Sequence, residues 1–136
     1  MSFEADYRAA LLTYSPLAAA LSFGSPAAYA LGIRLPQPAH FPAIRFQRVA
    51  TNRLYTMSGR NTLCEARVQH DCWAADSITA SDLADLLIRA LDTFTLIGGA
   101  GRPNFVINQW LIDEPEPESV MWRAFVEAKI YFSDSA

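Results

Sequence analysis

The side chains with the most reactive chemistry stand on one short stretch, which contains Cys64, His70 and Cys72. Thiolates and imidazoles are ligands that zinc prefers, and a cysteine with a histidine base is one form of catalytic nucleophile. The three residues fall on the same side of an alternating apolar and polar pattern, which is typical of a β-strand. A strand rises about 3.3 Å per residue, which spreads them too far for one ion with bonds of about 2.0–2.3 Å. We therefore expect His70 to be a core or interface histidine with a satisfied ring.

The other candidates for chemistry lack the setting that their reactions need. Cys64 and Cys72 lie roughly 26 Å apart on an extended strand, beyond disulfide reach, so we interpret them as small buried hydrophobic residues. His40 has no acidic or nucleophilic neighbour in sequence. The glycine-rich run 98–101 leads into a strand, whereas a phosphate-binding loop opens a helix. We expect no catalytic residue, no metal site and no cofactor.

Charged residues gather in two segments. Five arginines between positions 45 and 67 form the only basic cluster, and residues 113–118 alternate acidic residues with two prolines. The arginines could meet phosphate or the acidic segment of a neighbouring copy, and the net charge of −3 favours the second alternative. The acidic segment could bind a divalent cation, but it lacks the glycine and the spacing of a calcium loop. A solvated turn or a charged contact surface is the better interpretation.

Length and composition limit the architecture that can position these residues. The chain has 136 residues, of which 51% are hydrophobic and 18% charged, so we expect one domain spanning 1–136. With so little charge, some apolar surface should remain exposed, which suggests a partner or self-association. The acidic N-terminus does not resemble a signal peptide, and no run of about 18 apolar residues could span a membrane. We expect synthesis in the cytosol and no contact with a membrane.

Hydrophobic periodicity places the secondary structure. Apolar residues at helical spacing predict helices, and alternation predicts strands, with Ser15 capping the second helix and Ser77 or Thr79 capping the third. The predicted helices are 3–12, 17–21 and 77–94, and the predicted strands are a brief one near 33–35, then 43–49, 63–73, 104–112 and 121–132.

Two of these segments have features that bear on function. Residues 50–62 are polar and long, which predicts a protruding loop that is mobile in the free subunit. Strand 104–112 is apolar on both faces, which indicates an inner strand or one whose second face meets another chain. The element order predicts an α+β fold, an antiparallel sheet of about four strands with helices packed on one face.

Several motifs resemble a known family. They are Leu35-Pro36-Gln37, the strand Phe41-Pro42-Ala43-Ile44-Arg45-Phe46-Gln47-Arg48, the run Ala66-Arg67-Val68-Gln69-His70-Asp71-Cys72-Trp73-Ala74, and Leu83-Ala84-Asp85 with Ala90-Leu91 on a helix. Together they resemble the tail-completion proteins of long-tailed phages, also described as tail terminators or head–tail joining proteins, with relatives in phage-like gene transfer agents. The resemblance runs from about residue 5 to 132 and departs at His70, where the family more often has an aliphatic residue.

The resemblance implies a structural virion protein without enzymatic activity. Its expected form is a homo-oligomeric ring, usually of six copies in the family, that ends the tail tube and meets the head-side connector, with DNA only passing through the lumen. A neck adaptor of the same particle is the alternative, and a small hydrolase or nuclease is the remaining hypothesis. Ring subunits need two different, complementary surfaces, and aromatic residues suit their anchors. The candidate interface residues are Arg45, Arg48, Arg53, Arg60, Arg67, Trp73, Trp110, Asp113, Glu114, Glu116, Glu118 and Phe125.

Overall fold

The structure is a computed structural model that describes residues 3–21, 31–32, 42–56, 59–94, 104–113 and 122–133. At residues 31–32, 54–56, 59–62, 105, 112–113 and 133 it describes the backbone alone. The described elements are α1 (Phe3–Leu11), α2 (Ser15–Leu21), β1 (Leu31–Gly32), β2 (Ala43–Thr56), β3 (Gly59–Ala74), α3 (Ser77–Leu91), β4 (Phe105–Asp113) and β5 (Trp122–Ser133).

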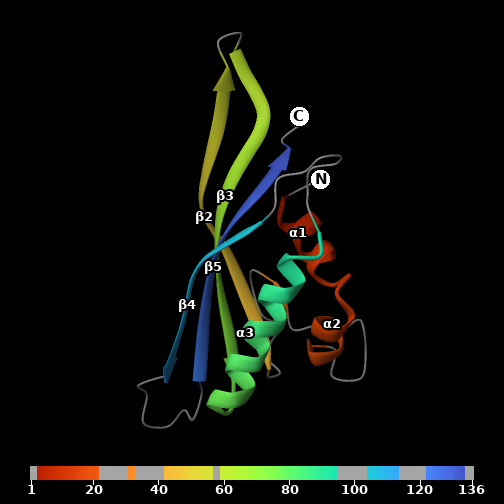
Figure 1. The fold of residues 1–136 in the computed structure, drawn as a ribbon, viewed down its shortest axis with the longest axis vertical. Helices are drawn as coiled ribbons and strands as arrows, with labels where there is room; N and C mark the ends of the chain where they lie inside the picture. The colour runs from red at the N-terminus through yellow and green to blue at the C-terminus, as the bar shows by residue number, and fades with distance from the viewer. Residues whose placement is uncertain are drawn as a thin grey trace.

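The strands form one sheet in the order β1-β2-β3-β5-β4. The four long strands pair antiparallel, and the two-residue β1 pairs in parallel with Ile44 and Arg45 of β2. All three helices lie on one side of this sheet, as Figure 1 shows. The predicted α+β class, with an antiparallel sheet and helices on one face, is confirmed.

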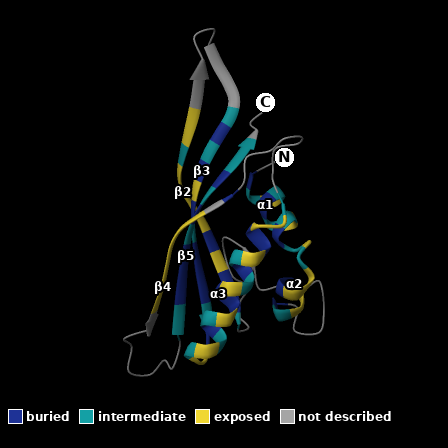
Figure 2. Ribbon diagram, in the orientation of Figure 1, coloured by how far each residue is buried: buried dark blue, intermediate teal, exposed yellow. Residues whose placement is uncertain are grey.

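The core lies between the helices and the facing side of the sheet (Figure 2). Phe3, Tyr7 and Leu11 recur every fourth residue of α1 and are all buried, which gives this helix a single apolar stripe. The even-numbered residues of β3 from Cys64 to Ala74 are buried on the same side, as the alternation predicts. Each fully buried aliphatic side chain there contributes about 1.5–3 kcal/mol relative to exposure.

Helix α3 begins at Ser77 as predicted, but its N-cap is neither Ser77 nor Thr79. The Asp76 side chain accepts a hydrogen bond from the Thr79 backbone N–H at 2.7 Å, so Asp76 is the N-cap. The same hydrogen bond is the largest cause that lowers the pKa of the Asp76 carboxyl. The helix ends at Leu91 and not at the predicted residue 94, and the buried Asn104 amide donates to the carbonyls of Leu91 and Phe94 beyond this end.

The predicted loop at 50–62 is wrong. Strand β2 continues to Thr56 and β3 begins at Gly59, so these residues form a two-stranded ribbon that rises beyond the rest of the sheet (Figure 1). The last contact of β3 with β5 is Leu63 opposite Ser133, and in the described residues no third strand pairs with the ribbon beyond that point. We call the described part of the ribbon beyond that point, residues 54–56 with 59–62, the arm.

Candidate functional site

His70 is buried in the core, where both of its ring nitrogens are engaged. Nδ1 lies 2.9 Å from the Val126 carbonyl oxygen, and Nε2 lies 2.6 Å from the Tyr7 hydroxyl oxygen. A carbonyl only accepts, so Nδ1 carries the proton and donates it to Val126, and Nε2 accepts from the Tyr7 hydroxyl. Neither nitrogen is left with a lone pair for a metal, and His70 is the satisfied core histidine that the sequence predicts.

Burial keeps the three titratable groups of this cluster neutral. Desolvation lowers the pKa of His70 to about 4, although the hydrogen bond to Val126 acts in the opposite direction. Burial also raises the pKa of Tyr7 well above its ordinary value and raises that of the Cys72 thiol strongly. A protonated thiol is a poor nucleophile, so Cys72 is a packing residue. Within the described ranges, no group of three or more His, Cys, Asp or Glu side chains could hold a metal ion.

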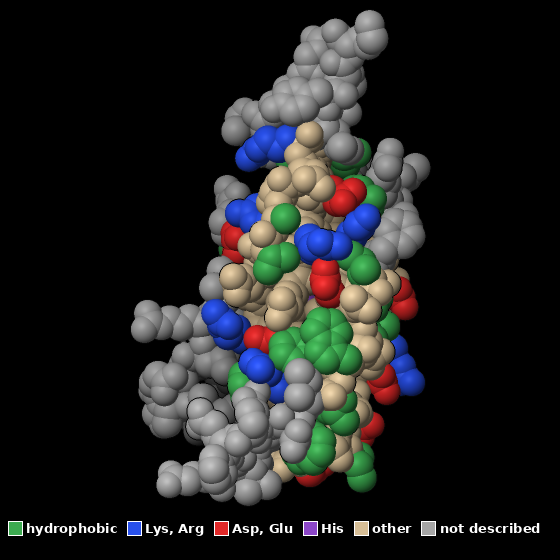
Figure 3. Space-filling view, turned by 90° about the vertical axis from the view of Figure 1, so that its left-hand side faces the viewer, with side chains coloured by type: hydrophobic (Ala, Val, Ile, Leu, Met, Phe, Trp, Pro, Cys, Tyr) green, Lys and Arg blue, Asp and Glu red, His purple; other side chains and the backbone are tan. Residues whose placement is uncertain are grey.

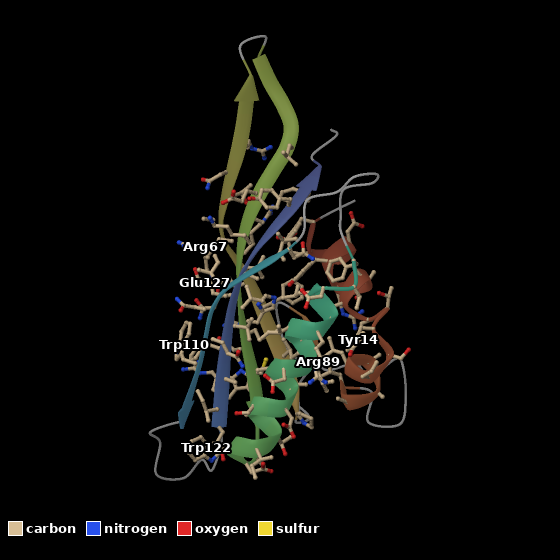
Figure 4. All side chains as sticks on the ribbon, in the orientation of Figure 1. Tyr14, Arg67, Arg89, Trp110, Trp122 and Glu127 are labelled. Atoms are coloured by element: carbon tan, nitrogen blue, oxygen red, sulfur yellow. The ribbon has the colours of Figure 1, made fainter. Side chains whose placement is uncertain are left out.

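The sheet face turned away from the helices carries a ladder of opposite charges. Arg67 Nε lies 2.7 Å from Glu127 Oε1, and Lys129 Nζ lies 3.7 Å from Glu65 Oε1. Arg67 and Glu127 both extend from the side of the sheet opposite the helices, as Figure 4 shows. Opposite charges facing each other across neighbouring strands stabilise their pairing modestly. The ladder therefore fixes strand register and leaves a mixed-charge surface there.

The predicted basic cluster is divided between the two faces of the sheet. Arg45 and Arg67 lie on the outer face, where Arg45 Nη1 is 3.8 Å from the nearly buried Asp71 carboxylate. Arg48 lies on the helix side, 3.1 Å from Glu4 and stacked over the ring of Phe3.

A β-bulge at position 49 separates the arginines further. The register shifts between Arg48 and Ala50, which reverses the alternation of β2 and brings Arg53 opposite Cys64 on the helix side. The arginines do not form one patch, because successive strand residues alternate faces and the bulge changes the alternation midway. The Arg60 side chain lies outside the described part of the structure.

Aromatic side chains and an arginine stack across the lower outer face. The rings of Trp110 and Phe125 are parallel with centroids 4.8 Å apart, and the Arg123 guanidinium lies 4.5 Å from the Phe125 ring and 4.7 Å from the Trp73 ring. Phe125, one of the candidate interface residues, is covered by Trp110 and Arg123, and only 6% of it is accessible. Trp73 is half-buried, and Trp110 remains 40% exposed. Arg123, which sequence reasoning did not select, joins the aromatic residues into one cluster.

Strand β4 is an edge strand with apolar side chains on both of its faces. In the described residues β5 is its only strand partner, so the inner position offered as one alternative is wrong. Four large apolar side chains of β4 are 38–42% exposed, namely Val106, Ile107, Trp110 and Leu111. Figure 3 shows this side of the molecule, with hydrophobic side chains among acidic and basic ones. An edge of this kind is a template for association with another chain.

Several predicted residues lie where their contacts are not described. His40, the glycine-rich run and three acidic candidates, Glu114, Glu116 and Glu118, are outside the described residues. Asp113 ends β4, and only its backbone is described. The structure also shows a shallow pocket between α2 and α3, lined by Ala20, Pro42, Thr79, Asp82, Leu83 and Leu86. A single carboxylate in that lining offers no acid–base pair.

The comparisons with known proteins agree with surfaces made for assembly. Residues 8–133 match the family described as tail completion protein gp17. The chain belongs to this family. A chain in a solved structure entitled "Virion of native gene transfer agent (GTA) particle" shares the fold, with a TM-score of 0.61 and 15% identity over 98% of this chain and 99% of that one. A search of curated proteins found no match.

Family membership makes this tail completion protein a structural component of a tail-bearing particle. A structural role agrees with the described geometry, in which Cys72, His70 and Tyr7 are buried and neutral. Among the described helices, none is both long enough and apolar enough to cross a bilayer. The described surface includes the exposed apolar edge strand β4 and the aromatic cluster around Arg123.

Proposed function

We propose that this tail completion protein forms a closed ring of about six copies at the head-proximal end of the tail. There it ends the growth of the tail tube and presents a docking surface to the head-side connector. The mechanism is steric and interfacial: one side of the ring covers the last ring of tube subunits, and the other side binds the neck. DNA meets the protein only as it passes through the lumen.

The exposed apolar edge strand β4 is the observation that carries this proposal. An edge with four large apolar side chains about 40% exposed costs solubility unless another protein covers it. A chain with the same fold is part of a gene transfer agent virion. In a particle of that kind, a neighbouring protein would cover the β4 edge. The half-exposed Trp110, stacked on Phe125, provides a rigid aromatic anchor of the kind that dominates interface energetics.

The arm supplies a second contact surface. A two-stranded ribbon is marginally stable in water by itself, because it buries neither face. We propose that the arm, which also contains Arg60, packs against the tail tube or a neighbouring copy in the assembled tail. Its amide hydrogens should then exchange more slowly in assembled tails than in free subunits.

Charge supports contacts between different surfaces. The acidic residues Asp113, Glu114, Glu116 and Glu118 lie in and just after the end of β4, while the arginines lie on β2 and β3. Since the arginines divide between two faces, we propose that Arg45 and Arg67 face one neighbour and that Arg48 and Arg53 face another. Oppositely charged surfaces of this kind set the orientation of subunits more than they set affinity.

Imaging and mass measurement together test the proposal. Light scattering after size-exclusion chromatography should give a ring mass for the protein alone or with purified tail tubes. Negative-stain images of tails with the labelled protein should place the label at one end of the tube. If the label lies on the connector and the tube ends carry none, the protein is a component of the neck and not of the tail end. A monomer that binds neither tubes nor connectors would refute both positions.

A further inference from the structure

Strand β2 forms the other long edge of the sheet, and its chemistry differs from that of β4. β1 covers only Ile44 and Arg45, so in the described residues no strand pairs with the outer side of β2 from residue 46 to 56. The only charged residues of β2 are three arginines, whereas the only charged residue of β4 is Asp113. One sheet therefore ends in a basic edge on one side and in an apolar edge with an acidic end on the other.

The directions of the strands allow these two edges to pair between copies. β2, β3, β5 and β4 each run antiparallel to the next, so β4 runs opposite to β2 within one copy. A neighbour related by rotation about a ring axis keeps its β2 nearly parallel to the first copy's β2. Its β2 edge would therefore meet β4 in antiparallel orientation, in which cross-strand hydrogen bonds are perpendicular to the strands.

We propose that β4 of one copy pairs with residues 46–56 of β2 in the next copy, so that a continuous sheet runs around the ring. This inference rests on the proposed ring and names the surfaces that close it. The occupant of the β4 edge is thus a second copy of this chain. Charge complementarity selects it, because the two arginines in residues 46–56, Arg48 and Arg53, meet an edge whose only charge is acidic.

The lengths and the offset of the two edges also fit a closed sheet. β4 has 9 residues, which fit within residues 46–56 of β2. Because β1 occupies the start of β2, the copy that supplies β4 must be displaced along the strands toward the arm of the copy that supplies β2. A sheet closes on itself only when its strands are tilted and staggered, and this displacement supplies a stagger at every copy. The arginines would also restrict indiscriminate edge pairing while they favour an acidic partner.

Complementary edge variants test the pairing. The β4 variant carries Ile107→Lys and Leu111→Lys, which place positive charge against the arginines of β2. The β2 variant carries Val49→Glu and Asn52→Glu. All four side chains are exposed, so both variants should fold, which circular dichroism verifies. Ile78→Lys is the matched control, because Ile78 is 73% exposed on α3, away from both edges.

Light scattering after size-exclusion chromatography, on the protein alone and with tail tubes, should show three results. The control assembles like the wild type, each double variant alone remains a monomer, and an equimolar mixture of the two assembles again. The mixture assembles because the intact β2 edge of one variant meets the intact β4 edge of the other, and because the introduced lysines then face the introduced glutamates. Amide exchange of residues 46–56 and 105–113 in the wild-type assembly should be at least tenfold slower than in the variants.

The contrary outcomes are distinct. If the β2 variant assembles like the wild type while the β4 variant does not, β4 pairs with another β4 or with a different surface, and the inference is overturned. If both double variants assemble like the wild type, the ring stands but this edge pairing fails. If the wild type is a monomer both alone and on tail tubes, the proposed ring itself fails.

Discussion

The buried chain from Tyr7 through His70 to Val126 makes the stability of the fold depend on pH. Desolvation holds the pKa of His70 at about 4 in the folded protein, against 6.5 in an unfolded chain. Between these values the unfolded chain binds a proton that the folded chain does not bind. The contribution of His70 is therefore complete above about pH 6.5 and is lost progressively as the pH falls toward 4.

The size of the effect follows from the two pKa values. The difference between 6.5 and about 4, at about 1.4 kcal/mol per pH unit, amounts to about 3 kcal/mol of unfolding free energy. A domain of this size has a total stability of about 5–15 kcal/mol, so acidification should remove a large part of it through one residue. Protonation of Nε2 would also reverse this hydrogen bond, because the Tyr7 hydroxyl oxygen would then accept from Nε2–H and its own proton would lose its acceptor.

Urea unfolding at pH values from 7.5 to 4 measures this loss. Wild type should lose about 3 kcal/mol more than His70→Gln over that range, because the carboxylates that titrate in both proteins cancel in the comparison. His40→Gln is the matched control and reports what the other histidine contributes. A gap between wild type and His70→Gln that stays constant from pH 7 to 4 would refute the reasoning, since it would mean that folded His70 binds its proton as easily as an unfolded one.

Three substitutions test other parts of the fold by equilibrium denaturation. Ile130→Ala should cost about 2–5 kcal/mol because this fully buried side chain leaves a cavity, and a loss under about 1 kcal/mol would show that the core collapses around it. Asn104→Ala should cost about 1–3 kcal/mol by leaving the Leu91 carbonyl without its amide donor, and unchanged stability would mean that water replaces the amide. Arg67→Ala should cost less than about 1 kcal/mol, because its pair with Glu127 is half-exposed, and a larger loss would indicate a cooperative charge ladder.

The sequence predicted best where one face of a strand is buried. Alternation along β3 identified the buried residues from Cys64 to Cys72. Because side chains alternate between the two faces of a strand, only one orientation of the strand places all of its apolar side chains against the core. The arm was missed for the complementary reason. Where no third strand pairs with the ribbon, the alternation has no sheet core to register against, so residues 54–56 and 59–62 are indistinguishable in sequence from a loop.

Contacts between distant segments could not be predicted from sequence. Tyr7 and His70 are separated by 63 positions, and no local pattern indicates that a helix hydroxyl meets that ring. The edge position of β4 depends on the strand order, which places β5 between β3 and β4. Phe125 alternates to the outer face as expected, yet its burial depends on a cross-strand tryptophan. The cap of α3 was misplaced by one residue because adjacent polar residues are all competent caps.

The division of chemistry between core and surface explains why an assembly role suits this chain. Desolvation stabilises the neutral forms of the imidazole, the phenol and the Cys72 thiol, and these groups pack α1 against the sheet. The outer face pairs its charges across strands, which leaves little net field there to attract a charged substrate. In the described residues the sheet is open on both sides, with an apolar edge at β4, a basic edge at β2 and an arm that extends beyond the other strands. In the ring that we propose, neighbouring copies cover these edges, and the stability of each copy would then be coupled to assembly.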